Sequence, residues 1–272
     1  MKGRVMKGRV MKGAAGQGPK PYLDSPVPVA FAHRGFSREG LENSLVAFQA
    51  AADLGYQYIE SDVHTTADGT AVLFHDDRLD RVTNAGGLIA QLPDAVVQQA
   101  LIGGTEHILA LADLVQALPD TRFNLDVKDA GSVDSLAAAI EEFGLHDRVC
   151  VASFSDKRRR AVLKQLSRPA ASSAGTGTMA AFLLLGPWLP RPLMRWFLRQ
   201  TDLLQIPVRQ GPLRLVTRRS VERAHRLGLK MHVWTINDPA EMNALFDLGV
   251  DGVMTDRADL LAGVMRERGY WA

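Results

Sequence analysis

The sequence has little cysteine and no apolar run long enough to cross a membrane. Cys150 is the only cysteine among 272 residues, which excludes an internal disulfide framework and is compatible with a reducing compartment. It lies within the apolar run 149–151, where we expect an inert, buried thiol. The apolar stretch 179–185 is interrupted by Gly186 and Pro187, whereas a transmembrane helix needs about twenty unbroken apolar residues. We therefore expect a cytoplasmic globular protein.

Beyond its first twelve residues the chain has no excess of basic side chains, although the formal net charge of the whole chain is +2. The first twelve residues, MKGRVMKGRVMK, carry five basic side chains, and without them the remainder has a net charge of −3. A mildly acidic body argues against nucleic acid as a partner. The repeat has no apolar core of the kind that a secretory signal requires. We predict a disordered basic tail over residues 1–22, unless translation starts at Met11, and one α/β domain over residues 23–272.

A repeated pattern indicates the architecture of this domain. A helix-like run, an apolar residue, a glycine and an apolar strand-like segment follow one another around residues 54–56, 143–145, 227–229 and 248–250. Glycine just after a helix readily adopts the left-handed conformation that ends it. The repetition of helix, glycine and buried strand predicts βα units and a parallel sheet.

The number of candidate strands fits a barrel once one of them is set aside. The candidates are residues 28–33, 57–63, 71–75, 122–128, 148–153, 170–174, 203–207, 230–235 and 251–255. The link 65–70 is too short for a parallel crossover, and Asp68-Gly69 is a turn signal. Residues 71–75 are thus predicted to form a hairpin with the second strand. Eight parallel strands remain, which predicts a (β/α)8 TIM barrel, with a doubly wound open sheet as the alternative.

Residues 175–202 are predicted to form a helical insertion after the fifth strand. Following the apolar stretch, Arg191, Arg195 and Arg199 recur at every fourth position, with Leu193, Trp196 and Phe197 between them. This pattern is typical of a helix at a membrane surface with snorkelling arginines, which would make a peripheral membrane contact through residues 179–200. A helical cap packed on the barrel rim explains the same pattern equally well.

In such a barrel the active site lies at the carboxyl ends of the strands, where the chain places several polar residues. The residues at these ends are His33 and Arg34, Glu60 and Asp62, His75 of the hairpin, Asp126 and Lys128, and Trp234. Glu60 and Asp62 are two apart on one strand, so their side chains point to the same face. Asp126 and Lys128 repeat this spacing on the next parallel strand.

The combination of these residues predicts a site that cleaves phosphodiesters. Three convergent carboxylates repel one another unless a cation lies among them, and an all-oxygen ligand set favours Mg²⁺ or Ca²⁺. Two histidines can serve as a general acid and base near neutral pH. Arg34 and Lys128 supply positive charge suited to a phosphate group.

These motifs resemble the glycerophosphodiester phosphodiesterase family. The resemblance rests on Ala32-His33-Arg34-Gly35, Glu42-Asn43-Ser44, Ile59-Glu60-Ser61-Asp62-Val63, Thr66 with Asp68-Gly69, Phe74-His75-Asp76, Asn124-Leu125-Asp126-Val127-Lys128, Ser153-Phe154, Val233-Trp234-Thr235-Ile236-Asn237, Gly249-Val250-Asp251-Gly252 and Thr255-Asp256. It covers residues 27–262, is most specific over residues 32–84, and implies a (β/α)8 barrel.

The resemblance also implies roles for individual residues. His33 and His75 would be the acid–base pair, Glu60, Asp62 and Asp126 the metal ligands, Arg34 and Lys128 the phosphate-binding residues, and Trp234 a border of the substrate site, with Glu42 and Asn43 in a supporting or direct ligand role. The family commonly has Glu where Asp126 stands, so this shorter side chain would reach the ion through water or hold it in a shifted position. Family members also often have Pro where this chain has Leu41.

The sequence therefore predicts metal-dependent hydrolysis of glycerophosphodiesters to glycerol 3-phosphate and an alcohol, a reaction of lipid and glycerol metabolism. A lysophospholipase D, or a phosphodiesterase similar to sphingomyelinase D that acts on lipids, is the alternative within the same chemistry. The third alternative is a binding or structural protein on a barrel that has lost catalysis. The intact set of histidines, carboxylates and basic residues argues against this third reading.

Overall fold

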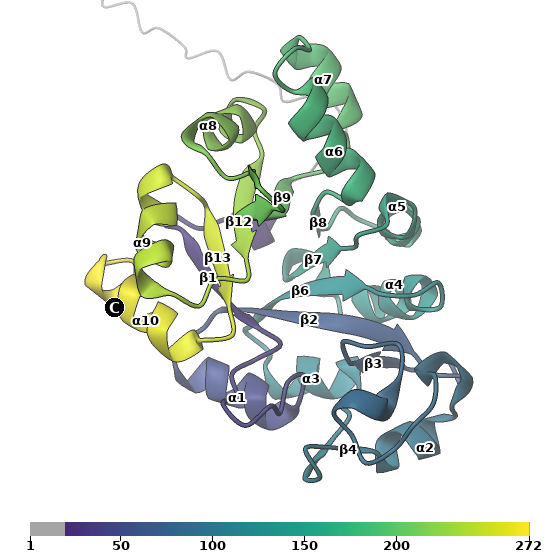
Figure 1. Cartoon of the computed structure of the whole chain (residues 1–272). Coiled ribbons are helices and arrows are strands. Elements are labelled where there is room, and N and C mark those ends of the chain that lie inside the picture. The colour runs from purple at the N-terminus through teal and green to yellow at the C-terminus, as the bar shows by residue number, and fades with distance from the viewer. Residues whose placement is uncertain (1–19, 272) are drawn as a thin grey trace, which may run out of the picture.

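Short buried strands and the helices between them build a barrel (Figure 1). The computed structural model describes residues 20–271. Within them, the parallel strands are β1 (Val29–His33), β2 (Tyr58–Thr65), β6 (Arg122–Val127), β7 (Val149–Ala152), β8 (Ala171–Ser172), β9 (Leu203–Pro207), β12 (Lys230–Trp234) and β13 (Gly252–Thr255). They are ordered β8-β7-β6-β2-β1-β13-β12-β9, and a single parallel bridge between Ser173 and Leu203 joins the two ends. The predicted (β/α)8 barrel is confirmed, and the open doubly wound sheet is excluded.

The short strand after β2 forms the predicted hairpin. β3 (Ala71–Leu73) pairs antiparallel with β2, with Leu73 opposite Val63. The turn between them contains Gly69, whose φ of +94° is a conformation that glycine adopts without strain. The hairpin carries the chain past the end of β2, and His75 follows it directly.

Helices cover the outside of the barrel and end where the glycines predict. They are α1 (Leu45–Asp53), α3 (Leu111–Ala117), α4 (Ser132–Glu142), α5 (Asp156–Gln165), α6 (Thr176–Leu185), α7 (Arg191–Phe197), α8 (Arg218–Arg226), α9 (Pro239–Leu248) and α10 (Ala258–Glu267). Four of the glycines that follow helices, Gly55, Gly144, Gly228 and Gly249, have positive φ values, between 62° and 99°. Among the described helices, none combines the length and apolar character that a membrane-crossing helix requires.

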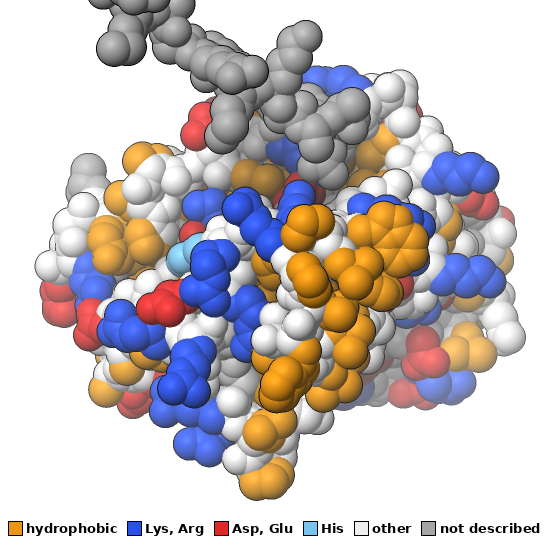
Figure 2. Space-filling view, turned by 90° about the horizontal axis from the view of Figure 1, so that it is seen from above, with side chains coloured by type: hydrophobic (Ala, Val, Ile, Leu, Met, Phe, Trp, Pro, Cys, Tyr) orange, Lys and Arg blue, Asp and Glu red, His pale blue; other side chains and the backbone are white. Residues whose placement is uncertain are grey.

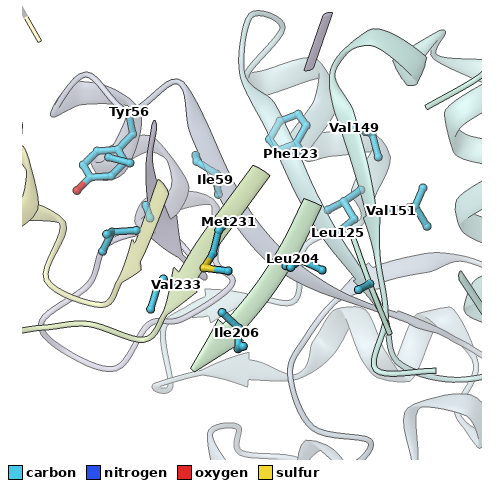
Figure 3. Packing of buried hydrophobic residues seen from close by; sticks show 14 of the residues in the cluster. Tyr56, Ile59, Phe123, Leu125, Val149, Val151, Leu204, Ile206, Met231 and Val233 are labelled. Carbon is cyan, nitrogen blue, oxygen red and sulfur yellow. The ribbon is translucent and has the colours of Figure 1, made fainter. Parts of the chain in front are cut away.

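Successive side chains along each strand point alternately outward to the helices and inward to the barrel interior. They form two apolar clusters, and the inward positions lead to the site. Ile59 and Phe123 belong to the large cluster that also contains helix residues, and Figure 3 shows their side chains among those of neighbouring strands. Phe31 and Tyr58 belong to a smaller cluster made almost wholly of strand residues, which fills the barrel interior. Cys150 is buried in this interior cluster, as expected of an inert thiol. Side chains two and four positions beyond Phe31 or Tyr58 therefore point into the mouth of the barrel.

A segment that sequence analysis did not foresee lies between the hairpin and α3. It contains η2 (Leu79–Arg81), η3 (Ile89–Gln91), α2 (Asp94–Gln99), β4 (Leu101–Ile102) and β5 (Glu106–His107). These short elements pack around their own apolar cluster, in which Leu79, Ile89 and Ile102 are fully buried. The segment thus forms a small lobe beside the loop that carries His75.

The helical insertion lies where it is predicted, after the fifth parallel strand. α6 and α7 follow β8, and the short hairpin of β10 (Arg209–Gln210) and β11 (Leu213–Arg214) precedes α8. Most of the predicted tail, residues 1–19, lies outside the described residues. Of its last three residues, Pro21 and Tyr22 belong to the turn η1 (Pro21–Leu23), Tyr22 is buried, and Lys20 Nζ lies 2.6 Å from Asp202 Oδ2. These three residues are part of the folded body.

Candidate active site

The turn after β1 fixes the first histidine at the barrel mouth. Gly35 has a φ of +84°, and a Cβ there would lie 2.7 Å from the carbonyl carbon of Ala47, so only glycine fits. His33 Nδ1 lies 2.6 Å from Asp256 Oδ1, and His33 Nε2 lies 3.8 Å from Glu60 Oε2. A carboxylate only accepts hydrogen bonds, so Nδ1 carries a proton and Nε2 is left facing the site. Burial opposes the charged ring, but the carboxylates of Glu60 and Asp256 raise the pKa of His33.

The two acidic residues of β2 point into the mouth beside His33. Glu60 and Asp62 are almost completely buried, with 6% and 2% of their surface exposed. Burial, followed by repulsion from Asp62, raises the pKa of Glu60 to about 7. Burial also opposes ionisation of Asp62, but Lys128 and Arg34 lower its pKa below the ordinary value. The pair therefore shares less negative charge than two separate carboxylates would carry.

Lys128 and Asp126 complete the cluster from the neighbouring strand. Asp126 lies opposite Asp62 in the register of β2 and β6. Lys128 Nζ lies 2.7 Å from Asp62 Oδ1 and 2.9 Å from Asp126 Oδ2. The other oxygen of Asp126, Oδ1, is buried and has no hydrogen-bond partner. The ammonium group thus bridges two of the three carboxylates.

A chain of ion pairs fixes the second histidine. His75 Nδ1 lies 2.6 Å from Asp76 Oδ1, and Asp76 Oδ2 lies 2.5 Å from Arg81 Nε. Burial alone would raise the pKa of Asp76, but hydrogen bonds from Arg81 and His75 outweigh it and lower the pKa. Arg81 Nη2 continues to Glu42 Oε1 at 2.6 Å, and Arg34 Nη1 lies 3.1 Å from the same oxygen. As for His33, a carboxylate on Nδ1 leaves Nε2 of His75 available for chemistry.

The residue after Glu42 ties the mouth to β2. Asn43 has a φ of +59°, a conformation that asparagine tolerates better than most side chains, and its N–H donates to Arg34 O at 2.9 Å. Asn43 Nδ2 donates to Asp62 Oδ2 at 3.2 Å, and Ser61 Oγ donates to Asn43 Oδ1 at 2.7 Å. The side chain is completely buried and therefore orients Asp62.

An aromatic pair borders the far side of the mouth. Trp234, at the end of β12, packs edge-on against Phe154, with ring centroids 6.0 Å apart. Phe154 is 60% exposed, although large apolar side chains are usually buried. The pair can therefore contact a ligand that enters the mouth.

The acidic cluster has the chemistry of a site for a hard cation. Among residues 20–271, no three His, Cys, Asp or Glu side chains are arranged to hold a metal ion as they stand. Asp126 Oδ1 is buried without a partner, and burial with repulsion from Asp62 raises the pKa of Glu60, so an added cation would be stabilised by both groups. Oxygen donors of this kind fit a divalent cation.

The structure brings all the predicted site residues to the barrel mouth, and it adds three to which the sequence analysis gave no role, although Asp76 and Asp256 stand in the motifs of the resemblance. Asp256, Asp76 and Arg81 hold the histidines through the contacts described above. Asp256 directly follows β13, so the reading of strand ends that found the other residues would have found it too. Asp76 directly follows His75, but Arg81 belongs to the unforeseen lobe and has no sequence signal of its own.

Comparison with known proteins identifies one family. The glycerophosphoryl diester phosphodiesterase family matches residues 33–260. A protein of Mycobacterium tuberculosis named probable glycerophosphodiester phosphodiesterase 2 is 42% identical over 244 residues, which cover 89% of this chain and 92% of that protein. A lysophospholipase D of Homo sapiens is 25% identical over 258 residues, covering 82% of each.

Solved structures share the fold. A phosphodiesterase of Oleispira antarctica, in complex with the product sn-glycerol-3-phosphate, superposes with a TM-score of 0.71 at 24% identity, covering 88% of this chain and 97% of that one. The family match extends over most of the chain and includes both histidines and all three carboxylates. The chain therefore belongs to the glycerophosphoryl diester phosphodiesterase family and is a phosphoric diester hydrolase.

Proposed function

We propose that the enzyme hydrolyses glycerophosphodiesters to glycerol 3-phosphate and an alcohol, with His33 and His75 as general acid and base. One observation carries this assignment: each imidazole has its Nδ1 held at 2.6 Å by a carboxylate, and each lies beside the acidic cluster. His33 Nε2 approaches Glu60, while the residue before His75 donates its N–H to Asp62 O at 3.0 Å. Two imidazoles with fixed tautomers beside one acidic cluster suit the transfer of two protons.

Glu60, Asp62 and Asp126 would hold one divalent cation, Mg²⁺ or Ca²⁺. Such an ion supplies positive charge that polarises a phosphate and favours ionisation of a nearby hydroxyl. The buried, unpartnered Asp126 Oδ1 supports this assignment, as does the raised pKa of Glu60. Asn43 would keep Asp62 oriented, and Glu42 would keep Arg34 and Arg81 in place.

The protein's own groups would then divide the reaction among them. Arg34 and Lys128 would bind the phosphate oxygens, because both carry a positive charge at the mouth beside Asp62. One imidazole Nε2 would accept the proton of the attacking hydroxyl or water, and the other would protonate the departing alcohol. Trp234, with Phe154, would border the alcohol group of the substrate.

A lipid substrate is the second candidate, as in a lysophospholipase D. It is favoured by the exposed apolar side chains of the helical insertion, of which Leu184 is 71% exposed and Trp188 84%. The similarity to a human protein of that name points in the same direction. The chemistry at the histidines would be the same for both substrates.

A panel of substrates tests both candidates. Glycerophosphocholine and lysophosphatidylcholine would be assayed with Mg²⁺, with Ca²⁺ and with a chelator, using wild type, His33→Ala and His75→Ala. We expect release of glycerol 3-phosphate from glycerophosphocholine, and a loss of turnover of about 10²–10⁴-fold in each variant. Turnover of both variants at the wild-type rate would refute the acid–base assignment. Strong preference for lysophosphatidylcholine would establish the second candidate instead.

A further inference from the structure

The helical insertion exposes a row of large apolar side chains that take no part in the proposed acid–base chemistry. Leu184 and Leu185 are the last residues of α6, Trp188 lies in the turn that follows, and Leu193 and Trp196 continue the row on α7. We call these five residues the α6–α7 ridge. Their exposed fractions run from 40% for Leu185 to 84% for Trp188. Figure 2 shows hydrophobic side chains gathered on this face in one patch, whereas scattered single residues are the rule on protein surfaces.

The two helices that carry the ridge are held in place by contacts on their opposite, buried side. Phe182 and Met194 are buried in the main core, one on each helix. Arg195 Nη1 donates to Leu227 O at 2.7 Å, which fastens α7 to the end of α8. Arg223 of α8 stacks over the Phe182 ring, with its Cζ 5.1 Å from the centroid. Arg195 is therefore turned towards α8. The predicted stripe of snorkelling arginines is wrong at this position.

The surface around the ridge is strongly cationic. Residues 176–226 contain nine arginines, no lysine and only two acidic residues, in a body that is otherwise acidic. Of the two acids, Asp202 is buried against Lys20, which leaves Glu222 as the exposed one. Arg191, Arg199, Arg218 and Arg219 are exposed, and in Figure 2 basic side chains border the apolar patch.

We propose that the ridge and the surrounding arginines form a docking face for an anionic lipid surface. Leucine and tryptophan side chains enter the boundary between headgroups and acyl chains, while arginines alongside bind lipid phosphates. Arg199 already stacks on Trp196, with its Cζ 4.8 Å from the ring centroid, so an aromatic anchor and a cation are presented together. A second copy fits this face less well, because a two-fold contact would bring the arginines of both copies together.

Of the helices that carry the ridge, only the start of α6 lies near the active site. α6 begins at the carboxyl end of the barrel, where Thr176 N donates to Phe154 O at 2.9 Å. The ridge begins near the opposite end of α6, at Leu184, eight residues after Thr176. Docking therefore concentrates the enzyme at a lipid surface without occupying the catalytic mouth, and hydrolysis of a water-soluble diester does not require it.

Vesicle co-sedimentation tests the proposal with the full chain. The probes are vesicles of phosphatidylcholine alone and of phosphatidylcholine mixed with phosphatidylglycerol, at low and high salt. The variants are Trp188→Ser/Trp196→Ser, which removes the aromatic anchors, and Arg218→Glu/Arg219→Glu, which reverses exposed charge. Arg168→Glu/Arg266→Glu makes the same charge change outside residues 176–226 and serves as the matched control. Melting temperature and glycerophosphocholine hydrolysis report whether each variant is folded.

We expect wild type to bind the anionic vesicles, to bind the neutral ones weakly, and to be released by salt. The ridge variant and the arginine variant should each bind at least about tenfold more weakly than wild type. Both should hydrolyse glycerophosphocholine at the wild-type rate, and the control should bind vesicles like wild type. Failure of wild type to bind anionic vesicles, or equal binding by all variants, would overturn the proposal. So would a stable dimer that Trp188→Ser/Trp196→Ser dissociates, since the face would then be a self-association interface.

Discussion

His64 Nε2 lies 3.3 Å from the main-chain oxygen of His75, and its other ring nitrogen lies 2.8 Å from Asp129 Oδ2. His64 is on β2, two residues after Asp62, and is 4% exposed. Asp129 follows Lys128 and also accepts hydrogen bonds from the N–H and Oγ of Ser132, at the start of α4. A buried imidazole therefore connects the end of β6 to the loop that positions His75.

The first prediction is that His64 acts on the reaction through the position of His75. In His64→Phe the ring's contacts with Asp129 and with the main-chain oxygen of His75 are both lost, so we expect kcat to fall about tenfold while KM changes little, as for loss of an interaction that acts only in the transition state. His64→Gln keeps an N–H donor and should recover part of the rate. Steady-state kinetics on glycerophosphocholine measure both constants.

A replacement elsewhere controls for the loss of a histidine. His107 is exposed and belongs to the lobe between the hairpin and α3, so His107→Phe should keep wild-type kcat and KM. A fall in kcat of the same size in His107→Phe, or wild-type kcat in His64→Phe, would contradict a positioning role for His64.

The second prediction concerns Asp256, which holds the Nδ1 proton of His33. In Asp256→Asn the amide can present N–H instead of oxygen and favours the wrong tautomer, so we expect kcat to fall about 10²-fold or more. Asp256→Glu keeps the carboxylate and should lose less. The pH profile of kcat should change in Asp256→Asn because the carboxylate that helps to raise the pKa of His33 is gone. An unchanged profile and rate would show that Asp256 has no part in the reaction.

The third prediction concerns the cation and the unusual Asp126. Chelation should abolish hydrolysis, and Mg²⁺ or Ca²⁺ should restore it and raise the melting temperature. Binding to the folded state alone stabilises by about 2.7 kcal/mol when free cation is 100 times its Kd. Asp126→Asn should bind more weakly because it removes a negative oxygen, and Asp126→Glu should bind at least as tightly as wild type. Calorimetric titration measures these affinities, and full activity after chelation would rule out the cation requirement.

Much of the site could be predicted because local spacing carries the information. The two-residue spacing of Glu60 and Asp62 places both on the interior face of β2, and Asp126 and Lys128 repeat it on β6. The eight parallel strands were recognisable for the same reason, since each is a short apolar run bounded by a glycine or a polar turn. The hairpin of β3 followed from a linker too short for any parallel connection.

The rest depends on contacts that no local pattern encodes. Asp256 meets His33 across 223 positions because the barrel closes β13 against β1. Arg81 reaches both Asp76 and Glu42 from a lobe of short turns, whose shape depends on isolated contacts rather than on a helical or strand period. Within that lobe, Asp94 accepts hydrogen bonds from Thr66 Oγ1 and Thr70 Oγ1. Such polar contacts leave no hydrophobic periodicity to read.

The last prediction is a loss of stability in acid that depends on Asp129. Burial opposes its ionisation, but hydrogen bonds from His64 and Ser132 lower the pKa of Asp129 from 3.8 to about 2. The unfolded chain therefore binds the proton first as the pH falls, so this stabilisation is complete above about pH 4 and is lost towards pH 2. In Asp129→Asn the free energy of unfolding should be lower at pH 5 and should fall less steeply between pH 4 and pH 2. Urea unfolding at several pH values measures this slope, with the exposed Asp120→Asn as the matched loss of one carboxyl group. Equal slopes for wild type and Asp129→Asn would mean that the folded state gains nothing from the charge of Asp129, and would contradict a stabilising contact between Asp129 and His64.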